Sequence, residues 1–294
     1  MGSFAKEKEF ERSWWEKYLS GILQQGPIPN HVAFIMDGNR RFAAKKHVER
    51  IEGHRKGFDK LAEMLRWCQD LDISEVTLYA FSAENFKRSK EEVDSLMELA
   101  RSKFAQILEE QDRLKEHGVR ISIIGELHLL PQDLQELAYK LMECTRNNNK
   151  CRLNVCVAYT SRHEMTQAVR DITWGLEHGL IEKSDISEQL FEKALQISSV
   201  DVLVRTSGEI RLSDFLLWQS SSSYLSFLNV LWPELTIWDF YWSVLQYQRC
   251  YKSIKKQQIA TELNTALTDT SSVKRMNNFI NSLCAKRDCF TECV

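Results

Sequence analysis

The sequence predicts a single α/β domain built on a six-stranded, mostly parallel sheet that is flanked by helices. Short apolar runs rich in β-branched residues recur between segments of helical period, an alternation typical of right-handed βαβ units. These runs are hydrophobic along nearly their whole length, which indicates strands buried on both faces. With 294 residues, of which 43% are hydrophobic and 27% charged, the chain has enough apolar material for one large core.

The expected elements are assigned by residue range. Strands are predicted at residues 32–36, 75–81, 120–124, 153–158, 200–204 and 225–231. Helices are predicted at residues 56–71, 90–117, 132–146, 162–177, 187–194 and 214–219. The predicted division of the chain is an N-terminal amphipathic helix in residues 1–26, the α/β domain in 27–251 and a polar, helical C-terminal tail in 252–294.

The helix predicted from residue 90 has the clearest start signal. Ser89 is placed to be its N-cap and Glu92 stands at the third helical position, which is the spacing of a capping box. An apolar stripe follows on one side of this helix, made of Val93, Leu96, Met97, Ala100, Phe104, Ile107, Leu108 and Leu114. Such a stripe usually faces a core, but it would serve equally well as the wall of a cavity for an apolar ligand.

The first 26 residues carry an amphipathic helical pattern. Its apolar side consists of Phe10, Trp14, Trp15, Tyr18, Leu19, Ile22 and Leu23. A helix docked on the domain explains this pattern, and so does a helix lying in a membrane interface, where paired tryptophans are common. Both interpretations stay open at this point.

Composition excludes several classes of protein. The net charge of −2 argues against nucleic acid as the main partner, because binding to phosphate backbones needs a basic excess. The eight cysteines form no CxxC pair, which favours reduced thiols in a cytosol-facing protein. We expect no signal peptide, since the first residues are charged, and no spanning helix, since no apolar run approaches ~20 residues.

Polar residues collect where three of the predicted strands end. The first strand leads into Met36-Asp37-Gly38-Asn39-Arg40-Arg41, and the second leads into the segment 80–88. The fifth leads into Arg205-Thr206-Ser207-Gly208-Glu209-Ile210-Arg211-Leu212-Ser213-Asp214. Ligands of open parallel sheets bind beyond these strand ends, and arginine forks around small residues suit phosphate groups.

Each of these segments also has a plain structural explanation. An Asp-Gly turn and a solvated basic face would explain the first, an ordinary turn the second, and an N-cap serine at Ser213 the third. Their convergence favours an anion site with a metal candidate in Asp37, because a carboxylate can share Mg²⁺ with phosphate oxygens. There is no Walker A loop and no dinucleotide fingerprint. The sequence therefore predicts phosphate chemistry without a nucleotide motif.

These segments resemble the cis-prenyltransferases, the family of the undecaprenyl and dehydrodolichyl diphosphate synthases, and most closely its animal members. The resemblance runs from about Pro27 to about Phe240. Its motifs are the segment 31–41, the Gly53-His54 pair, the segment 81–88, the segment 205–209 with Arg211 and Ser213, and Phe215-Leu216-Leu217-Trp218-Gln219 ahead of Trp232-Pro233-Glu234.

The resemblance implies a role for each residue of this polar wall. Asp37 would hold Mg²⁺, the expected cofactor, on the allylic diphosphate. The phosphate oxygens of that substrate would be bound by Asp37 through the metal and by Gly38, Asn39, Arg40, Arg41 and Arg50. Isopentenyl diphosphate would be bound by Arg41, Arg88, Arg205, Arg211 and Ser213. The catalytic residues would be Asp37, Asn85 and Arg88, the last two lying between the substrates.

The implied activity adds isopentenyl diphosphate units to farnesyl diphosphate, giving a long dehydrodolichyl-type diphosphate for dolichol and protein glycosylation. Substrate diphosphate and groups linked to Asn85 are both candidates for the base that accepts the proton. His54 would be an acid–base or a structural hydrogen-bonding residue. The growing chain would occupy an apolar tunnel with walls and floor formed by Trp67, Leu96, Ala100, Phe104 and Ile121.

The sequence departs from the family pattern in two places. Bacterial homodimeric members carry a metal-binding Glu shortly after the Phe-Leu-Leu-Trp-Gln segment, where this chain has Ser220-Ser221-Ser222-Ser223-Tyr224. Many members end in an Arg-x-Gly that completes a partner's isopentenyl site, whereas this sequence ends Phe290-Thr291-Glu292-Cys293-Val294. Both departures match animal members that work with a Nogo-B-receptor-like subunit. We therefore expect a heteromer on the cytosolic face of the endoplasmic reticulum membrane, in peripheral contact with it.

Two other functions explain the polar wall less well. A non-catalytic scaffold with a degenerate fold would have no physical need for Asp37 and the arginines together. A phosphohydrolase with Asp37 as nucleophile would need further acidic ligands and a lysine at other strand ends, and no such set is found. Catalytic prenyl transfer remains the better prediction.

Overall fold

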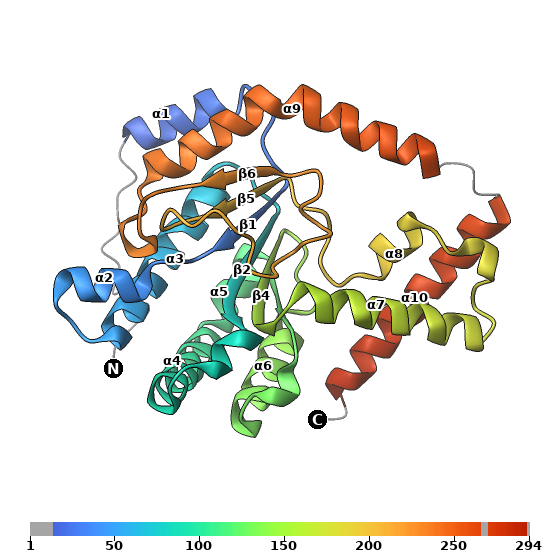
Figure 1. The fold of residues 1–294 in the computed structure, drawn as a ribbon, viewed down its shortest axis with the longest axis horizontal. Helices are drawn as coiled ribbons and strands as arrows, with labels where there is room; N and C mark the ends of the chain where they lie inside the picture. Colours follow the sequence, from blue (N-terminus) through green and yellow to red (C-terminus); the bar gives the residue numbers. More distant parts are fainter. Residues whose placement is uncertain (1–13, 266–269, 293–294) are drawn as a thin grey trace.

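The computed structural model describes residues 14–265 and 270–292 and contains a six-stranded sheet in which every pair of neighbours is parallel. The strand order is β3-β4-β2-β1-β5-β6 (Figure 1). The strands are β1 (His31–Ile35), β2 (Glu75–Ser82), β3 (Val119–Ile124), β4 (Cys151–Tyr159), β5 (Val202–Arg205) and β6 (Tyr224–Phe227). The predicted fold class is confirmed, with the sheet wholly rather than mostly parallel.

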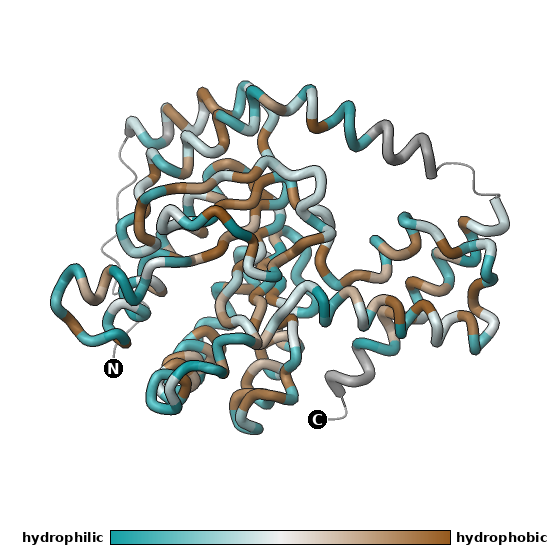
Figure 2. Tube along the Cα trace, in the orientation of Figure 1, coloured by the Kyte–Doolittle hydropathy of each residue, from teal (hydrophilic) through white to brown (hydrophobic). Residues whose placement is uncertain are grey.

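Ten helices and four short 3₁₀ turns surround the sheet in the described part of the chain. The α-helices are α1 (Trp14–Leu23), α2 (Asn39–Lys46), α3 (Arg50–Asp70), α4 (Lys90–Glu109), α5 (Gln111–His117), α6 (Gln132–Thr145), α7 (Ser161–Glu177), α8 (Glu188–Ala194), α9 (Ile237–Thr265) and α10 (Thr270–Glu292). The 3₁₀ turns are η1 (Ala83–Lys87), η2 (Leu127–Leu129), η3 (Lys183–Asp185) and η4 (Trp232–Glu234). Figure 2 shows the hydrophobic residues concentrated in the strands and along one side of most helices.

One face of the sheet is covered by two separately packed groups of helices. The first hydrophobic cluster packs α3 and α9 on β1, β2 and β5, and it includes Phe34, Met64 and Phe240. The second packs α4 and α6 on β3 and β4, and it includes Phe104 and Leu134. Because α3 and α4 are anchored in different clusters, the space between them above the sheet need not be filled by protein side chains.

The predicted helix at residues 214–219 is wrong. This segment is a series of turns, and Ser213, Asp214 and Leu216 have positive φ values of 50°, 59° and 47°. Its side chains are drawn into the core instead, since Phe215 is fully buried and stacks on Tyr79 at 4.4 Å between ring centroids. Tertiary packing has therefore overridden the local start signal at Ser213.

Helix ends differ from the predicted ranges in other parts of the chain as well. α9 runs without a break across residues 251 and 252, where the α/β domain was predicted to end and the tail to begin. The predicted helix at 90–117 is divided at Glu110 into α4 and α5. α10 packs on α7 and α8 through a cluster that contains Phe279 and Leu283. Predicted features at Phe10 and at the last two residues lie outside the described residues.

Candidate active site

The carboxyl ends of β1, β2 and β5 open into one cavity of about 2060 Å³. All the residues predicted to bind diphosphates or to act in catalysis line it: Asp37, Gly38, Asn39, Arg40, Arg41, Arg50, Asn85, Arg88, Arg205, Arg211 and Ser213. The parallel register places these strand ends side by side, with Ile35 of β1 opposite Tyr79 of β2 and Arg205 of β5. Segments that are distant in the sequence therefore form a single polar entrance to the cavity, which we call the mouth.

An ion pair between Asp37 and Arg205 joins the ends of β1 and β5. Nη2 of Arg205 lies 2.8 Å from Oδ2 of Asp37, and Nη1 donates a hydrogen bond to Oγ of Ser213 at 2.8 Å. The Arg205 side chain is only 4% exposed. Thr206 Oγ1 also donates to the carbonyl oxygen of Asp37 at 2.6 Å. The pair therefore holds both loops in place.

The Asp37 carboxylate is kept ionised by its neighbours. Burial alone would raise the pKa of Asp37, but the hydrogen bond and charge of Arg205, with help from Ser207 and Arg41, lower that pKa below its ordinary value. Its side chain is 32% exposed on the cavity side. An ionised carboxylate that is still accessible from the cavity can serve as a metal ligand.

α2 approaches α3 closely because two glycines remove the intervening side chains. A Cβ atom at Gly53 would collide with the carbonyl oxygen of Asn39, and one at Gly57 would collide with Oδ1 of Asn39. Gly38 precedes α2 with φ 111°, a backbone conformation that disfavours other residues. This packing aims the N-terminus of α2, with its free N–H groups, at the mouth of the cavity.

Glu92 is a residue of this site that the sequence analysis missed. Its carboxylate binds three guanidinium groups, those of Arg88 at 2.8 Å, Arg50 at 3.0 Å and Arg40 at 3.7 Å, while its side chain is 8% exposed. The backbone N–H of Glu92 does donate to Ser89 as predicted. The sequence analysis missed the binding of the arginines because the capping-box spacing already explained a glutamate at this position.

The second loop of the mouth is fixed by its own turn. Asn85 Oδ1 accepts a hydrogen bond from the Ser82 N–H at 3.1 Å, within a capping box of η1. Arg88 follows immediately and is oriented by Glu92. Asn85 and Arg88 thus reach the cavity from a short, well-determined turn.

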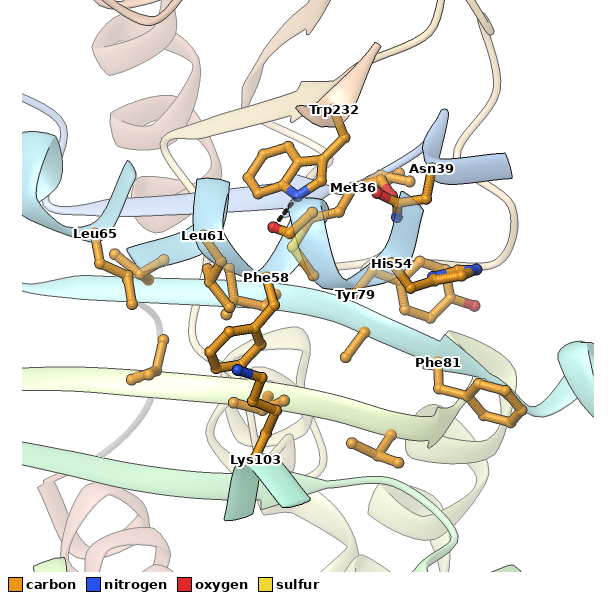
Figure 3. Close-up of a pocket in the computed structure, with 18 of the residues that line it drawn as sticks. Met36, Asn39, His54, Phe58, Leu61, Leu65, Tyr79, Phe81, Lys103 and Trp232 are labelled. Carbon is orange, nitrogen blue, oxygen red and sulfur yellow. Dashed lines mark hydrogen bonds between the residues drawn. The ribbon is translucent and has the colours of Figure 1, made fainter. Parts of the chain in front are cut away.

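The middle of the cavity is an apolar tunnel between α3 and α4, and charged residues such as Arg66, Glu110 and Arg113 line its far end. Four of the five predicted tunnel residues, Leu96, Ala100, Phe104 and Ile121, line it. Figure 3 shows Phe58, Leu61 and Leu65 of α3 lying along the cavity above the strands. The stripe on α4 is therefore both core and cavity wall, with Phe104 also part of the second cluster.

The assignment of Trp67 to the tunnel is wrong. Trp67 does not line the cavity, and its ring stacks on Phe240 of α9 at 6.3 Å between centroids, inside the first cluster. From the sequence alone, a buried aromatic residue on α3 can be assigned to either side of that helix. Only the position of α9, which the sequence analysis did not predict, decides between the two sides.

The donor set fits a magnesium ion that is shared with a substrate. Asp37 offers one carboxylate, and no group of three or more acidic, His or Cys side chains suited to a metal occurs in residues 14–265 and 270–292. Mg²⁺ is commonly held by one or two carboxylates together with substrate phosphates. Asp37 beside the arginines of the mouth matches that arrangement.

The α/β fold and this site define a class of enzyme that handles a diphosphate group attached to a long apolar chain. Residues 35–255 match the prenyltransferase family described as "Putative undecaprenyl diphosphate synthase". The chain is 58% identical over 252 residues to the dehydrodolichyl diphosphate synthase complex subunit DHDDS of Homo sapiens, covering 85% of this chain and 76% of the human one.

Two more distant proteins agree with this match. A tritrans,polycis-undecaprenyl-diphosphate synthase of Methanocaldococcus jannaschii is 43% identical over 80% of this chain and 85% of its own. The crystal structure of lavandulyl diphosphate synthase from Lavandula x intermedia superposes with a TM-score of 0.69 at 32% identity, covering 75% of this chain and 95% of that one. The chain therefore belongs to the cis-prenyltransferase family, as its motifs predicted.

Replacing Glu92 tests how the arginines are held together. In Glu92→Gln, three guanidinium groups would repel one another, so added pyrophosphate should stabilise the variant more than it stabilises the wild type. We expect the rise in melting temperature on adding pyrophosphate to be larger by about 2 °C or more. Glu91→Gln, an exposed neighbour on the same turn, is the control. Equal rises in wild type and Glu92→Gln would contradict this role.

His54 should make folding stability sensitive to acid. Burial, followed by the charge of Arg88, lowers the pKa of His54 to about 4, below the ordinary value of 6.5. Between pH 6.5 and 4 the unfolded chain therefore binds a proton that the folded chain refuses, so stability falls as the pH falls. Urea unfolding at pH 7 and pH 5 should show a loss of stability smaller by about 2 kcal/mol in His54→Gln than in the wild type. The same pH dependence of the free energy of unfolding in wild type and His54→Gln would refute the lowered pKa of His54.

Proposed function

We propose that this chain is the catalytic subunit of a cis-prenyltransferase that adds isopentenyl diphosphate units to an allylic diphosphate such as farnesyl diphosphate. The product would be a long polyprenyl diphosphate of the dehydrodolichyl type, for dolichol synthesis and protein glycosylation. One observation carries the proposal: a single cavity joins an arginine-lined mouth to an apolar tunnel. That shape suits a substrate with a polyanionic head and a lengthening hydrocarbon tail.

The residues of the mouth would divide the two substrates between them. Arg40, Arg41 and Arg50, with the N-terminus of α2, would bind the allylic diphosphate. Arg205, Arg211 and Ser213, together with Arg41 and Arg88, would bind isopentenyl diphosphate. Mg²⁺ on Asp37 would neutralise charge on the diphosphate that departs.

The reaction forms one carbon–carbon bond and breaks one carbon–oxygen bond. The allylic carbon–oxygen bond breaks and its electron pair leaves with the diphosphate, while the double bond of isopentenyl diphosphate supplies the pair for the new bond. A proton is then lost from the added unit, which restores a double bond in the cis configuration. Arg88 and Asn85, which both line the cavity, would orient the reacting carbons, and substrate diphosphate or a group linked to Asn85 would accept the proton.

A second subunit is part of the proposal. The similar human, mouse and fission yeast proteins are each named as a complex subunit, and this chain has serines where a metal-binding glutamate was expected, at residues 220–223. A Nogo-B-receptor-like partner with a C-terminal Arg-x-Gly would complete the isopentenyl site.

The proposed location is the cytosolic face of the endoplasmic reticulum membrane. No helix in the described part of the chain is long and apolar enough to cross a bilayer. On α1, Tyr18 and Ile22 are exposed, and on α9 Trp238 and Trp242 are exposed, while Trp15 stacks on Trp238 at 5.4 Å. α1 is thus docked on α9 and still presents apolar side chains outward, so both interpretations of the N-terminal helix keep support.

Incorporation of labelled isopentenyl diphosphate into extractable lipid tests the function. With farnesyl diphosphate, Mg²⁺ and a Nogo-B-receptor-like subunit, we expect product from the wild type and a loss of at least about a hundredfold in Asp37→Ala. The chain alone should give little product. Undiminished product from Asp37→Ala would place the chemistry in the partner and leave this chain a scaffold.

Magnesium binding should depend on a diphosphate. A lone carboxylate paired with Arg205 holds Mg²⁺ weakly, whereas substrate phosphates supply the missing oxygen ligands. Isothermal titration of Mg²⁺ should give measurable binding only with a non-reactive thiolo analogue of farnesyl diphosphate present, beyond the binding of Mg²⁺ by the analogue alone. Tight binding to the free chain would show a separate metal site and contradict the shared one.

A further inference from the structure

The apolar stretch of the tunnel wall contains one ionic side chain. Among the described residues that line the cavity within 58–65 of α3 and 96–107 of α4, Lys103 alone is charged. Its ammonium nitrogen lies 4.2 Å from the centroid of the Phe58 ring, and it donates a hydrogen bond to Oε1 of Gln106 at 3.3 Å. Figure 3 shows the Lys103 side chain against the Phe58 ring.

This contact bridges the two groups of helices. α3 is anchored through Met64 in the first cluster, and α4 is anchored through Phe104 in the second. A cation over an aromatic face is attracted by the ring, and the attraction strengthens when both are shielded from water. It is still weak enough that a bound hydrocarbon chain could break it.

The position of the pair along the tunnel matters for a growing chain. Lys103 lies on α4 about 16 Å beyond Glu92, at the helical rise of 1.5 Å per residue. Glu92 marks the arginine-lined mouth, where the diphosphate would sit. A short starter chain therefore reaches the pair, and each further isoprene unit has to pass it.

We propose that Phe58 and Lys103 form a cation–π latch between α3 and α4 that a lengthening product must part, and that this latch limits product length. The inference rests on the proposed function. Chains that end at the latch bind without disturbing it. Longer chains separate the two side chains, so each longer product is held less tightly than its added apolar area alone would give.

The test compares ligands that end before and beyond the latch. Lys103→Met keeps an unbranched, flexible side chain that is one atom shorter and removes its charge, whereas Lys103→Arg keeps the cation. Lys60→Met is a matched control, because Lys60 lies 5.4 Å from the Trp67 ring, outside the cavity. Melting curves establish that each full-length variant is folded. Calorimetric titrations use farnesyl diphosphate and undecaprenyl diphosphate in the same detergent.

The latch predicts a selective gain of affinity. Lys103→Met should bind undecaprenyl diphosphate about two- to tenfold more tightly than the wild type does, with farnesyl diphosphate unchanged. Lys103→Arg and Lys60→Met should match the wild type. In turnover assays with the partner subunit, only Lys103→Met should make products longer than those of the wild type.

Three outcomes would overturn the latch. The first is an equal ratio of the affinities for undecaprenyl and farnesyl diphosphate in wild type and Lys103→Met. The second is the same gain of affinity for undecaprenyl diphosphate in Lys103→Arg as in Lys103→Met. The third is no binding of undecaprenyl diphosphate by any of the variants. Measuring this ratio of affinities requires no catalytic turnover. Failure of the wild type to incorporate label would therefore overturn the proposed function separately.

Discussion

A nearly buried guanidinium group at the end of β5 organises this molecule. A charge as enclosed as that of Arg205 is tolerated only when fixed partners surround it. Its partners come from three places, the Asp37 carboxylate after β1, the backbone oxygen of Arg211 and the hydroxyl of Ser213. Pairing the two terminal nitrogens of one arginine thus fixes two loops against each other. The geometry of a diphosphate site follows from that requirement before any ligand arrives.

The tunnel follows from a second constraint, which is that one sheet face carries two cores rather than one. Packing α3 directly on α4 would bury more apolar surface at ~25 cal/mol per Å². The structure forgoes that gain and leaves a cavity of about 2060 Å³. Stability is instead supplied on the far sides of the two helices, by α9 behind α3 and by α6 behind α4. A prenyl chain entering the gap would bury part of the apolar surface that folding leaves exposed in the cavity.

The sequence was sufficient for the sheet and for most of the mouth. Strands buried on both faces have an unambiguous apolar signature, and parallel pairing brings their polar ends together, so Asp37 and Arg205 could be placed in one site. Features that depend on which elements pack against one another were missed or misplaced. Ser213 looked like a helix cap because the Tyr79–Phe215 stacking is invisible in sequence. Trp67 could not be assigned to a side of α3 without α9, and two of the three arginine partners of Glu92 come from other helices.

The arginines of the mouth are already paired with carboxylates in the absence of substrate, and this has a consequence for turnover. Asp37 and Glu209 flank Arg41, and Glu92 pairs with Arg40, Arg50 and Arg88. A bound diphosphate would therefore exchange existing ion pairs for new ones rather than fill a bare basic pocket. Binding is weakened by the pairs it displaces, and for an enzyme that must release a diphosphate after every condensation such weakening is useful. The same reasoning applies along the tunnel, where a weak Lys103–Phe58 contact competes with each added isoprene unit. The mouth and the Lys103–Phe58 contact then both favour release of the product over tight retention.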